Sequence, residues 1–193
     1  MSGFSLLVKE IAECKICSEQ LPCMPRPILQ INPKAKILIA GQAPGKKAHN
    51  SGTPFDDLSG ERLRKWLGIS YETFYDPEQV AILPMGFCFP GTGKSGDLPP
   101  RKECADTWHK KVLHHLNQIE LTIVIGRYAQ QYYFGKAAHS VTELVASWQN
   151  YYPTTIPLPH PSPRNNIWIR KNPWFEIELL PTLKQRVNEC LAQ

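Results

Sequence analysis

Four cysteines form the clearest candidate site for chemistry in the sequence. Cys14 and Cys17 are separated by two residues, a spacing that lets two thiolates reach one metal ion. Cys88 and Cys104 flank a loop that is rich in glycine and proline. Four thiolates satisfy a tetrahedral zinc ion or a four-iron–four-sulfur (4Fe–4S) cluster. The same residues could instead be separate buried cysteines, which behave as small apolar side chains.

A histidine in a proline-rich loop is the second candidate. Pro161 and Pro163 stiffen the chain on either side of Ser162. This rigidity would present His160 as a hydrogen-bond donor to an anion, while Ser162, Arg164 and backbone amides could hold a phosphate. The alternative is a proline-rich turn with a structural histidine.

A third group of residues follows a turn near position 52. Phe55 comes after Gly52-Thr53-Pro54 and could stack on a planar ring, although a core phenylalanine is the commoner explanation for one such residue. Asp56 and Asp57 could orient a water molecule or cap the helix that follows them.

The elements that must position these residues alternate between strands and helices. Short apolar runs predict buried strands, and the segments between them favour helices. The alternation predicts a three-layer α/β fold with a mostly parallel four-stranded sheet, in one domain over residues 1–193. Residues 1–34 form an N-terminal arm that carries the first cysteine pair. The expected strands are 37–40, 80–83, 121–125 and 154–158, and the expected helices are 2–13, one from about 59, 101–118, 141–148 and 173–190.

Three of the four predicted strands end in loops rich in glycine and proline. The first such loop, residues 41–45, contains Gly41 and Gly45, which lack a Cβ and allow a ligand to approach the backbone closely. Ligands of open α/β sheets bind at the carboxyl ends of the strands. The three loops therefore predict one site at that edge, although residues 41–45 alone could be an ordinary turn.

Composition restricts the class of protein. Hydrophobic residues make up 42% of the chain and charged residues 20%, which is typical of a globular domain. The net charge of +5 favours an anionic partner such as nucleic acid. No apolar run reaches the roughly 18 residues of a membrane span, and no signal peptide is visible. We therefore expect a cytoplasmic monomer without disulfides, in which Cys190 packs in the last helix and Cys23 is an alternative metal ligand.

Three segments, in order, resemble motifs of the uracil-DNA glycosylase superfamily. Residues 41–45 (Gly-Gln-Ala-Pro-Gly) are similar to the first motif of its iron–sulfur branch, known from thermophiles. Residues 160–165 (His-Pro-Ser-Pro-Arg-Asn) are similar to the second motif, with an ending like that of the single-strand-selective branch. Residues 52–55 match the segment whose phenylalanine stacks on the base. The likeness covers nearly the whole chain.

The resemblance implies a glycosylase that flips uracil or another deaminated base out of DNA and hydrolyses its N-glycosidic bond. Phe55 would stack on the base, and His160 would stabilise the charge that leaves with it. The loop after the fourth strand would enter the minor groove. The resemblance also favours a 4Fe–4S cluster over zinc. The implied catalytic residues are His160, Gln42, Asp56 and Asp57, and the implied base- or DNA-binding residues are Gly41, Ala43, Pro44, Gly45, Phe55, Pro84, Ser162, Arg164 and Asn165.

Two positions depart from the family pattern. The first motif usually has an acidic or amide residue that positions water, and here Gln42 and Ala43 supply no carboxylate. Pro84 stands where an asparagine often reads uracil, and proline has neither a side-chain donor nor an amide hydrogen. Either the base is then not uracil, or it is read by Gln42, Asn165 or Asn166. Alternatives are a weak or inactive protein that binds DNA or a base, and a nucleoside or nucleotide N-glycosidase.

Overall fold

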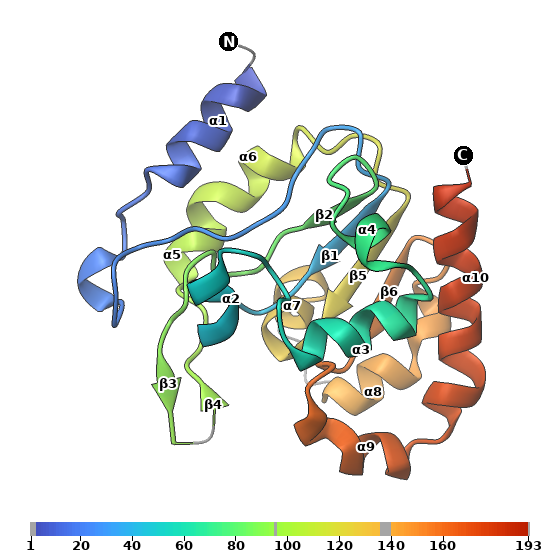
Figure 1. Cartoon of the computed structure of the whole chain (residues 1–193). Coiled ribbons are helices and arrows are strands. Elements are labelled where there is room, and N and C mark those ends of the chain that lie inside the picture. The colour runs from blue at the N-terminus through green and yellow to red at the C-terminus, as the bar shows by residue number, and fades with distance from the viewer. Residues whose placement is uncertain (1–2, 95, 136–139, 193) are drawn as a thin grey trace.

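A parallel sheet of four strands forms the centre of the structure (Figure 1). The computed structural model describes residues 3–94, 96–135 and 140–192. Within these residues the strand order is β2-β1-β5-β6, and all three neighbouring pairs are parallel. This arrangement confirms the predicted three-layer α/β fold with a four-stranded parallel sheet. The strands are Ile37–Ala40 (β1), Val80–Ile82 (β2), Leu121–Ile125 (β5) and Thr155–Leu158 (β6).

Helices cover both faces of the sheet because successive side chains of a strand point to opposite sides. Ile39 of β1 packs on one face with helices α3 (Leu58–Leu67) and α10 (Leu180–Leu191). Its neighbour Leu38 packs on the other face with α1 (Gly3–Ala12). All four residues of β1 are buried, which explains why the strand is apolar throughout rather than alternating.

Several short elements lie where the sequence suggested irregular chain. They escaped prediction because each is too short, or too polar, to show a helical or strand period. These elements are α2 (Lys46–Ser51), α4 (Tyr71–Phe74), α9 (Asn166–Lys171) and the antiparallel hairpin of β3 (Thr92–Gly93) and β4 (Gly96–Asp97).

The helix expected over residues 101–118 was predicted too long and too regular. It consists of α5 (Lys102–Cys104), a π-helical turn over Ala105–His109 and α6 (Lys110–Leu113). Such turns interrupt α-helices, often at functional sites. Here the turn carries the buried side chain of His109.

The helix expected over residues 173–190 is likewise divided into a π-helical turn and α10, and the remaining expected helices lie near their predicted positions. The π turn spans Phe175–Leu179, directly before α10. The other helices are α7 (Gly126–Tyr133) and α8 (Val141–Ala146). Ser140 caps α8 because its side chain accepts from the Glu143 N–H while the Glu143 carboxylate accepts from the Ser140 N–H.

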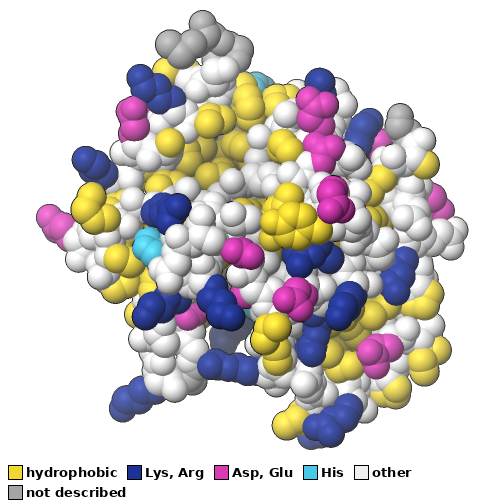
Figure 2. Space-filling model, in the orientation of Figure 1, with side chains coloured by type: hydrophobic (Ala, Val, Ile, Leu, Met, Phe, Trp, Pro, Cys, Tyr) yellow, Lys and Arg dark blue, Asp and Glu magenta, His cyan; other side chains and the backbone are white. Residues whose placement is uncertain are grey.

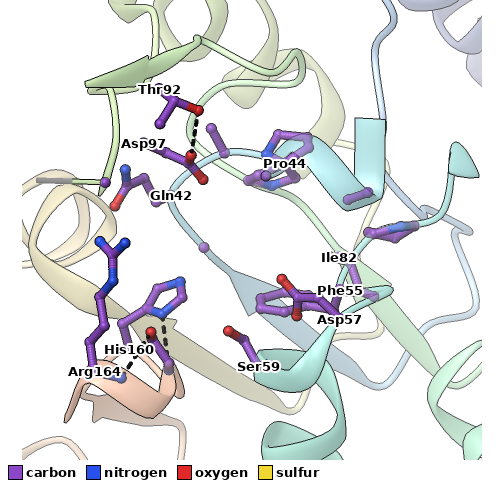
Figure 3. A pocket seen from close by; sticks show the side chains of 18 of the residues that line it. Gln42, Pro44, Phe55, Asp57, Ser59, Ile82, Thr92, Asp97, His160 and Arg164 are labelled. Carbon is purple, nitrogen blue, oxygen red and sulfur yellow. Dashed lines mark hydrogen bonds between the residues drawn. The ribbon is translucent and has the colours of Figure 1, made fainter. Parts of the chain in front are cut away.

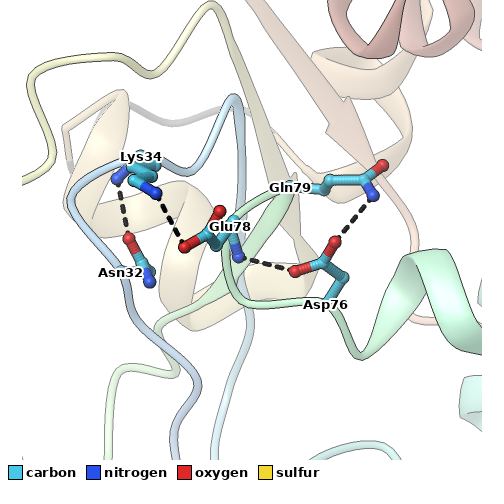
Figure 4. Close-up of polar contacts among 5 residues, drawn as sticks. All are labelled: Asn32, Lys34, Asp76, Glu78 and Gln79. Atoms are coloured by element: carbon cyan, nitrogen blue, oxygen red, sulfur yellow. Dashed lines mark hydrogen bonds and ion pairs between the residues drawn. The ribbon is translucent and has the colours of Figure 1, made fainter.

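The N-terminal arm packs along the sheet as extended chain. Gln30 forms an antiparallel bridge with Ile82, and the Ile28 N–H donates to the Phe87 carbonyl at 2.7 Å. Figure 4 shows a further contact, where Lys34 pairs with Glu78 at 2.9 Å in the turn before β2. In the part of the chain that the structure describes, no helix is both long and apolar enough to cross a membrane.

We predict that Gly60→Ala destabilises the fold by about 1–3 kcal/mol, the usual cost of overpacking. A Cβ at position 60 would overlap the backbone carbonyl of Phe55. Urea unfolding measures the change in the free energy of unfolding. The control is Gly3→Ala, because a Cβ there meets its nearest atom at an ordinary 3.9 Å. Equal stability of the two variants would contradict the prediction.

Candidate active site

A cavity of about 480 Å³ opens at the carboxyl edge of the sheet (Figure 3). Loops that follow β1, β2 and β6 form most of its wall, and the start of α3 and the β3–β4 hairpin complete it. Its size is that of a small-ligand pocket. Most residues named from the sequence line it: Gly41, Gln42, Ala43, Pro44, Gly45, Phe55, Asp57, Pro84, His160, Ser162, Arg164 and Asn165.

The loop at residues 41–45 is fixed by backbone hydrogen bonds to the loop after β2. The Met85 N–H donates to the Gly41 carbonyl at 2.9 Å, and the Gly86 N–H donates to the Gln42 carbonyl at 3.0 Å. These bonds continue the pairing of β1 with β2 beyond the ends of both strands. The first and second loops therefore form one rigid wall of the cavity.

Phe55 is held in a sparsely populated backbone conformation. Its φ is +55°, which is uncommon for a residue with a side chain and is typical of functional sites when the surroundings enforce it. The ring packs edge-on against Phe74 with centroids 6.2 Å apart, and it also faces the cavity. Gly41 leaves space for the ring, since a Cβ there would lie 3.4 Å from it. Phe55 thus joins the core and still offers a ring to the cavity.

His160 is arranged as a neutral hydrogen-bond donor. Its Nδ1 accepts from the Ser162 N–H at 3.2 Å, so in the neutral ring the proton resides on Nε2. Burial lowers the pKa of His160 below its ordinary value, and the nearby Asp57 and Asp97 carboxylates oppose this shift. The depressed pKa keeps the ring neutral near pH 7. Protonation would be unfavourable in the folded state, so this group lowers stability as the pH falls below about 6.5.

Polar contacts hold the loop that carries His160. The Asn165 side-chain amide donates to the His160 carbonyl at 2.7 Å. Arg62 of α3 donates to the Ser162 carbonyl at 3.2 Å, and the Ser162 hydroxyl accepts from the Arg164 N–H at 3.3 Å. The loop is therefore anchored on α3 as well as stiffened by its prolines.

The two adjacent aspartates have different positions. Asp57 lines the cavity and also caps α3, because its Oδ1 accepts from the Gly60 N–H at 2.9 Å. The helix therefore begins at Leu58, just before the expected start at Ser59. Asp56 is exposed and does not line the cavity.

Gln42 and Pro84 are both engaged through polar contacts. The Gln42 Nε2 donates to the Leu98 carbonyl at 3.4 Å, close to the limit of a hydrogen bond. The Pro84 carbonyl lies 2.9 Å from the Nε2 of buried His109. Burial lowers the pKa of His109, so its neutral ring donates to this carbonyl and fixes the turn at Pro84.

The hairpin residues of the cavity wall were missed from the sequence. Thr92, Gly96 and Asp97 line the cavity, together with Ser59 at the start of α3. Strands of two residues in a glycine-rich loop give no periodic signal. Asp97 is the only residue among these four whose side chain is ionisable, and its charge acts on His160.

Basic side chains surround this face of the molecule. Figure 2 shows lysine and arginine side chains on both sides of the hollow between the hairpin and α3. This distribution agrees with the net charge of +5 and suits an anionic ligand.

The four predicted metal ligands come from the arm, the loop after β2 and α5. Cys17, Cys88 and Cys104 are buried, Cys14 is half-buried, and all four are free thiols. The pKa of Cys88 is raised to about 11 and that of Cys104 to about 12, mainly by burial and in smaller part by the charges of Cys14 and Cys17. The sulfurs are thus close enough to interact electrostatically. Among the described residues, however, no three His, Cys, Asp or Glu side chains are arranged to hold one metal ion.

The fold and the cavity define an α/β protein with a pocket at the carboxyl ends of parallel strands, where such folds bind ligands, and with an aromatic ring and a neutral histidine in its wall. A family model described as the uracil DNA glycosylase superfamily matches residues 29–184. The chain therefore belongs to the uracil DNA glycosylase superfamily, a glycosylase-like family whose members act on DNA. The matched range includes the cavity, Cys88 and Cys104, whereas Cys14 and Cys17 precede it.

We predict that His160 titrates below pH 6.5 and that Asp97→Asn lowers its pKa further. The amide removes a negative charge that stabilises the imidazolium. Nitrogen chemical shifts of the imidazole, followed by NMR across pH, measure the midpoint and report the Nε2–H tautomer. Asp106→Asn is the control because Asp106 is exposed on the π turn before α6. A rise in the midpoint for Asp97→Asn would contradict the assigned geometry.

Proposed function

We propose that this protein excises uracil or another deaminated base from DNA by hydrolysing the N-glycosidic bond. The observation that carries the proposal is the meeting of Phe55 and the Nε2–H of His160 in one cavity, in a member of this superfamily. Duplex DNA buries the reacting atoms, so the base must be flipped into a pocket before cleavage. The basic surroundings of the cavity support DNA as the ligand.

The geometry supports a mechanism in which the base leaves as an anion. The flipped base stacks on Phe55, and backbone groups of the 41–45 loop contact its edge. As the bond between C1′ and the base nitrogen breaks, negative charge collects on the base. The His160 Nε2–H donates a hydrogen bond to a base oxygen and stabilises that charge. A water molecule bonds to C1′ on the opposite face of the sugar and releases a proton, and the departing base anion takes up a proton from solvent.

Recognition of the base must differ from the pattern in which an asparagine reads uracil. Pro84 occupies that position, and its carbonyl already accepts from His109. The Asn165 amide donates to the His160 carbonyl. Gln42 lines the cavity beside the 41–45 amides and donates to Leu98 through its Nε2, so we propose that its Oε1 reads the base edge.

A second candidate function is binding of a flipped base without cleavage. The observation that favours it is the absence of a carboxylate from the first motif, where Ala43 lines the cavity and the Gln42 amide bonds to Leu98. Tight binding to uracil-containing DNA without an abasic product would support this function. Preference for a mononucleotide would instead indicate a nucleotide N-glycosidase.

The cofactor that we propose is a 4Fe–4S cluster on Cys14, Cys17, Cys88 and Cys104. Backbone N–H groups of Phe87 and Arg26 face the sulfurs of Cys104 and Cys88, and such donors stabilise thiolates bound to clusters. The thiols interact electrostatically but are not arranged around a single ion. The resemblance of residues 41–45 to the iron–sulfur branch favours a cluster, in which each iron takes one thiolate, over zinc. When bound, the cluster would tie the arm to the loop after β2.

Substituting His160 by alanine is expected to slow base excision on the order of 10²–10³-fold, the effect of losing one donor to a developing anion. The measurement is alkali cleavage of single-stranded and duplex oligonucleotides, each with one uracil, hypoxanthine or xanthine, under single-turnover conditions. His114→Ala, an exposed substitution beyond the end of α6, is the control. An unchanged rate of base excision for His160→Ala would contradict the proposed role of His160 in stabilising the leaving base.

The cluster is tested by metal content. We expect a brown protein with thiolate-to-iron absorption and about four irons per chain. Cys104→Ala should lose the iron and the colour, whereas Cys190→Ala should retain both, because Cys190 packs in the core on the other face of the sheet. If the protein contained one zinc per chain, the proposed cofactor would be zinc and not the cluster. A folded protein without metal would contradict the proposed metal site.

A further inference from the structure

Hydrolysis at C1′ needs a group that holds the attacking water and accepts its proton. In the first motif Gln42 is an amide and Ala43 has no polar side chain, so neither accepts a proton. Two carboxylates line the cavity, those of Asp57 and Asp97. The Oδ1 of Asp57 accepts the N-cap hydrogen bond of α3, which limits its freedom to face a water. Asp97 comes from a different element, the β3–β4 hairpin.

The Asp97 carboxylate stands directly over the first-motif loop. A Cβ at position 45 would lie 3.2 Å from Asp97 Oδ2, so the glycine leaves the carboxylate room beside the backbone. The other oxygen, Oδ1, is 3.5 Å from the Thr92 hydroxyl on the facing strand of the hairpin. Figure 3 shows Asp97 at the cavity wall, near Gln42 and on the same side as Pro44.

Contacts from two other loops hold the hairpin in this position. Gln42 donates to the carbonyl of Leu98, the residue after Asp97. The guanidinium of Arg164 packs against Gly96, the residue before Asp97, where even a Cβ would collide with it. The loops at residues 41–45 and 160–165 therefore each contact a residue next to Asp97.

The positions of Asp97 and His160 suit the two parts of the reaction, which are the attack of water on C1′ and the departure of the base. The negative charge of Asp97 acts to raise the pKa of His160, so the two side chains are close enough to interact electrostatically. They come from different loops, which allows a proton acceptor on one side of the sugar and a hydrogen-bond donor to the leaving base on the other.

We propose that Asp97 is the catalytic carboxylate that holds and deprotonates the attacking water; this rests on the proposed glycosylase function. The water oxygen bonds to C1′, the bond from C1′ to the base nitrogen breaks, and its electron pair goes to the base. The proton of the water passes to Asp97 and then to solvent. The base anion, hydrogen-bonded to His160, takes up a proton on release.

The experiment compares wild-type protein with Asp97→Asn, Asp97→Ala and the exposed control Asp106→Asn in single-turnover excision. Asp97→Asn should slow excision on the order of 10²-fold or more, the usual contribution of a general base. Its affinity for DNA should be unchanged or higher, because the variant removes a negative charge near the phosphates. Added formate should partly restore the rate of Asp97→Ala, and it should not restore His160→Ala. Circular dichroism and DNA binding check that each variant is folded.

The outcomes separate the two proposals. If wild-type protein excises a base and folded Asp97→Asn keeps that rate, the role of Asp97 is overturned and the glycosylase function stands. A slow Asp97→Ala that formate does not rescue, with an unchanged pH profile, would make Asp97 structural and would also overturn its role. If wild-type protein excises none of the three bases, the proposed function fails and the role of Asp97 fails with it.

Discussion

The close approach of Gly60 to the carbonyl of Phe55 sets the geometry on which the site depends. The turn between them places Phe55 at a positive φ, starts α3 at the Asp57 cap and directs the ring towards both Phe74 and the cavity. Helix α3 in turn buries its apolar face against the sheet. The strained backbone conformation of Phe55 persists because packing against Phe74 on one side and the Asp57 cap of α3 on the other hold it in place. Stability of the core and presentation of the stacking ring are thus consequences of one contact.

Two opposing effects set the protonation state of His160. Burial favours the neutral ring, whereas the carboxylates of Asp57 and Asp97 favour the imidazolium. Burial prevails, and the Ser162 N–H then selects the tautomer by donating to Nδ1. A neutral Nε2–H donor gains hydrogen-bond strength as negative charge grows on its partner. In the proposed reaction a cation would also bind the anionic base more tightly, so the depressed pKa of His160 suits release of the base as much as stabilisation of its charge.

The sequence was sufficient for the sheet and for most of the cavity wall because both depend on local signals. Apolar runs reveal buried strands, and parallel strands bring the loops at their carboxyl ends to one edge, so Phe55, His160 and the loop at 41–45 could be predicted together. Asp97 could not, since its place depends on contacts of the hairpin with Gln42 and Arg164, far away in the sequence. The polar helix α2 was missed for a related reason: Lys46–Ser51 has a single buried residue and no apolar stripe.

The N-terminal arm is physically connected to the cavity through Arg26. Its guanidinium donates to the carbonyls of His49 and Asn50 at 2.6 and 2.9 Å, at the end of α2, the helix that the first-motif loop leads into. The backbone N–H of the same residue faces the sulfur of Cys88. One residue therefore joins a cysteine of the loop after β2 to the helix behind the cavity wall. The proposed cluster would therefore bind to the same arm that is hydrogen-bonded to the helix behind the cavity wall.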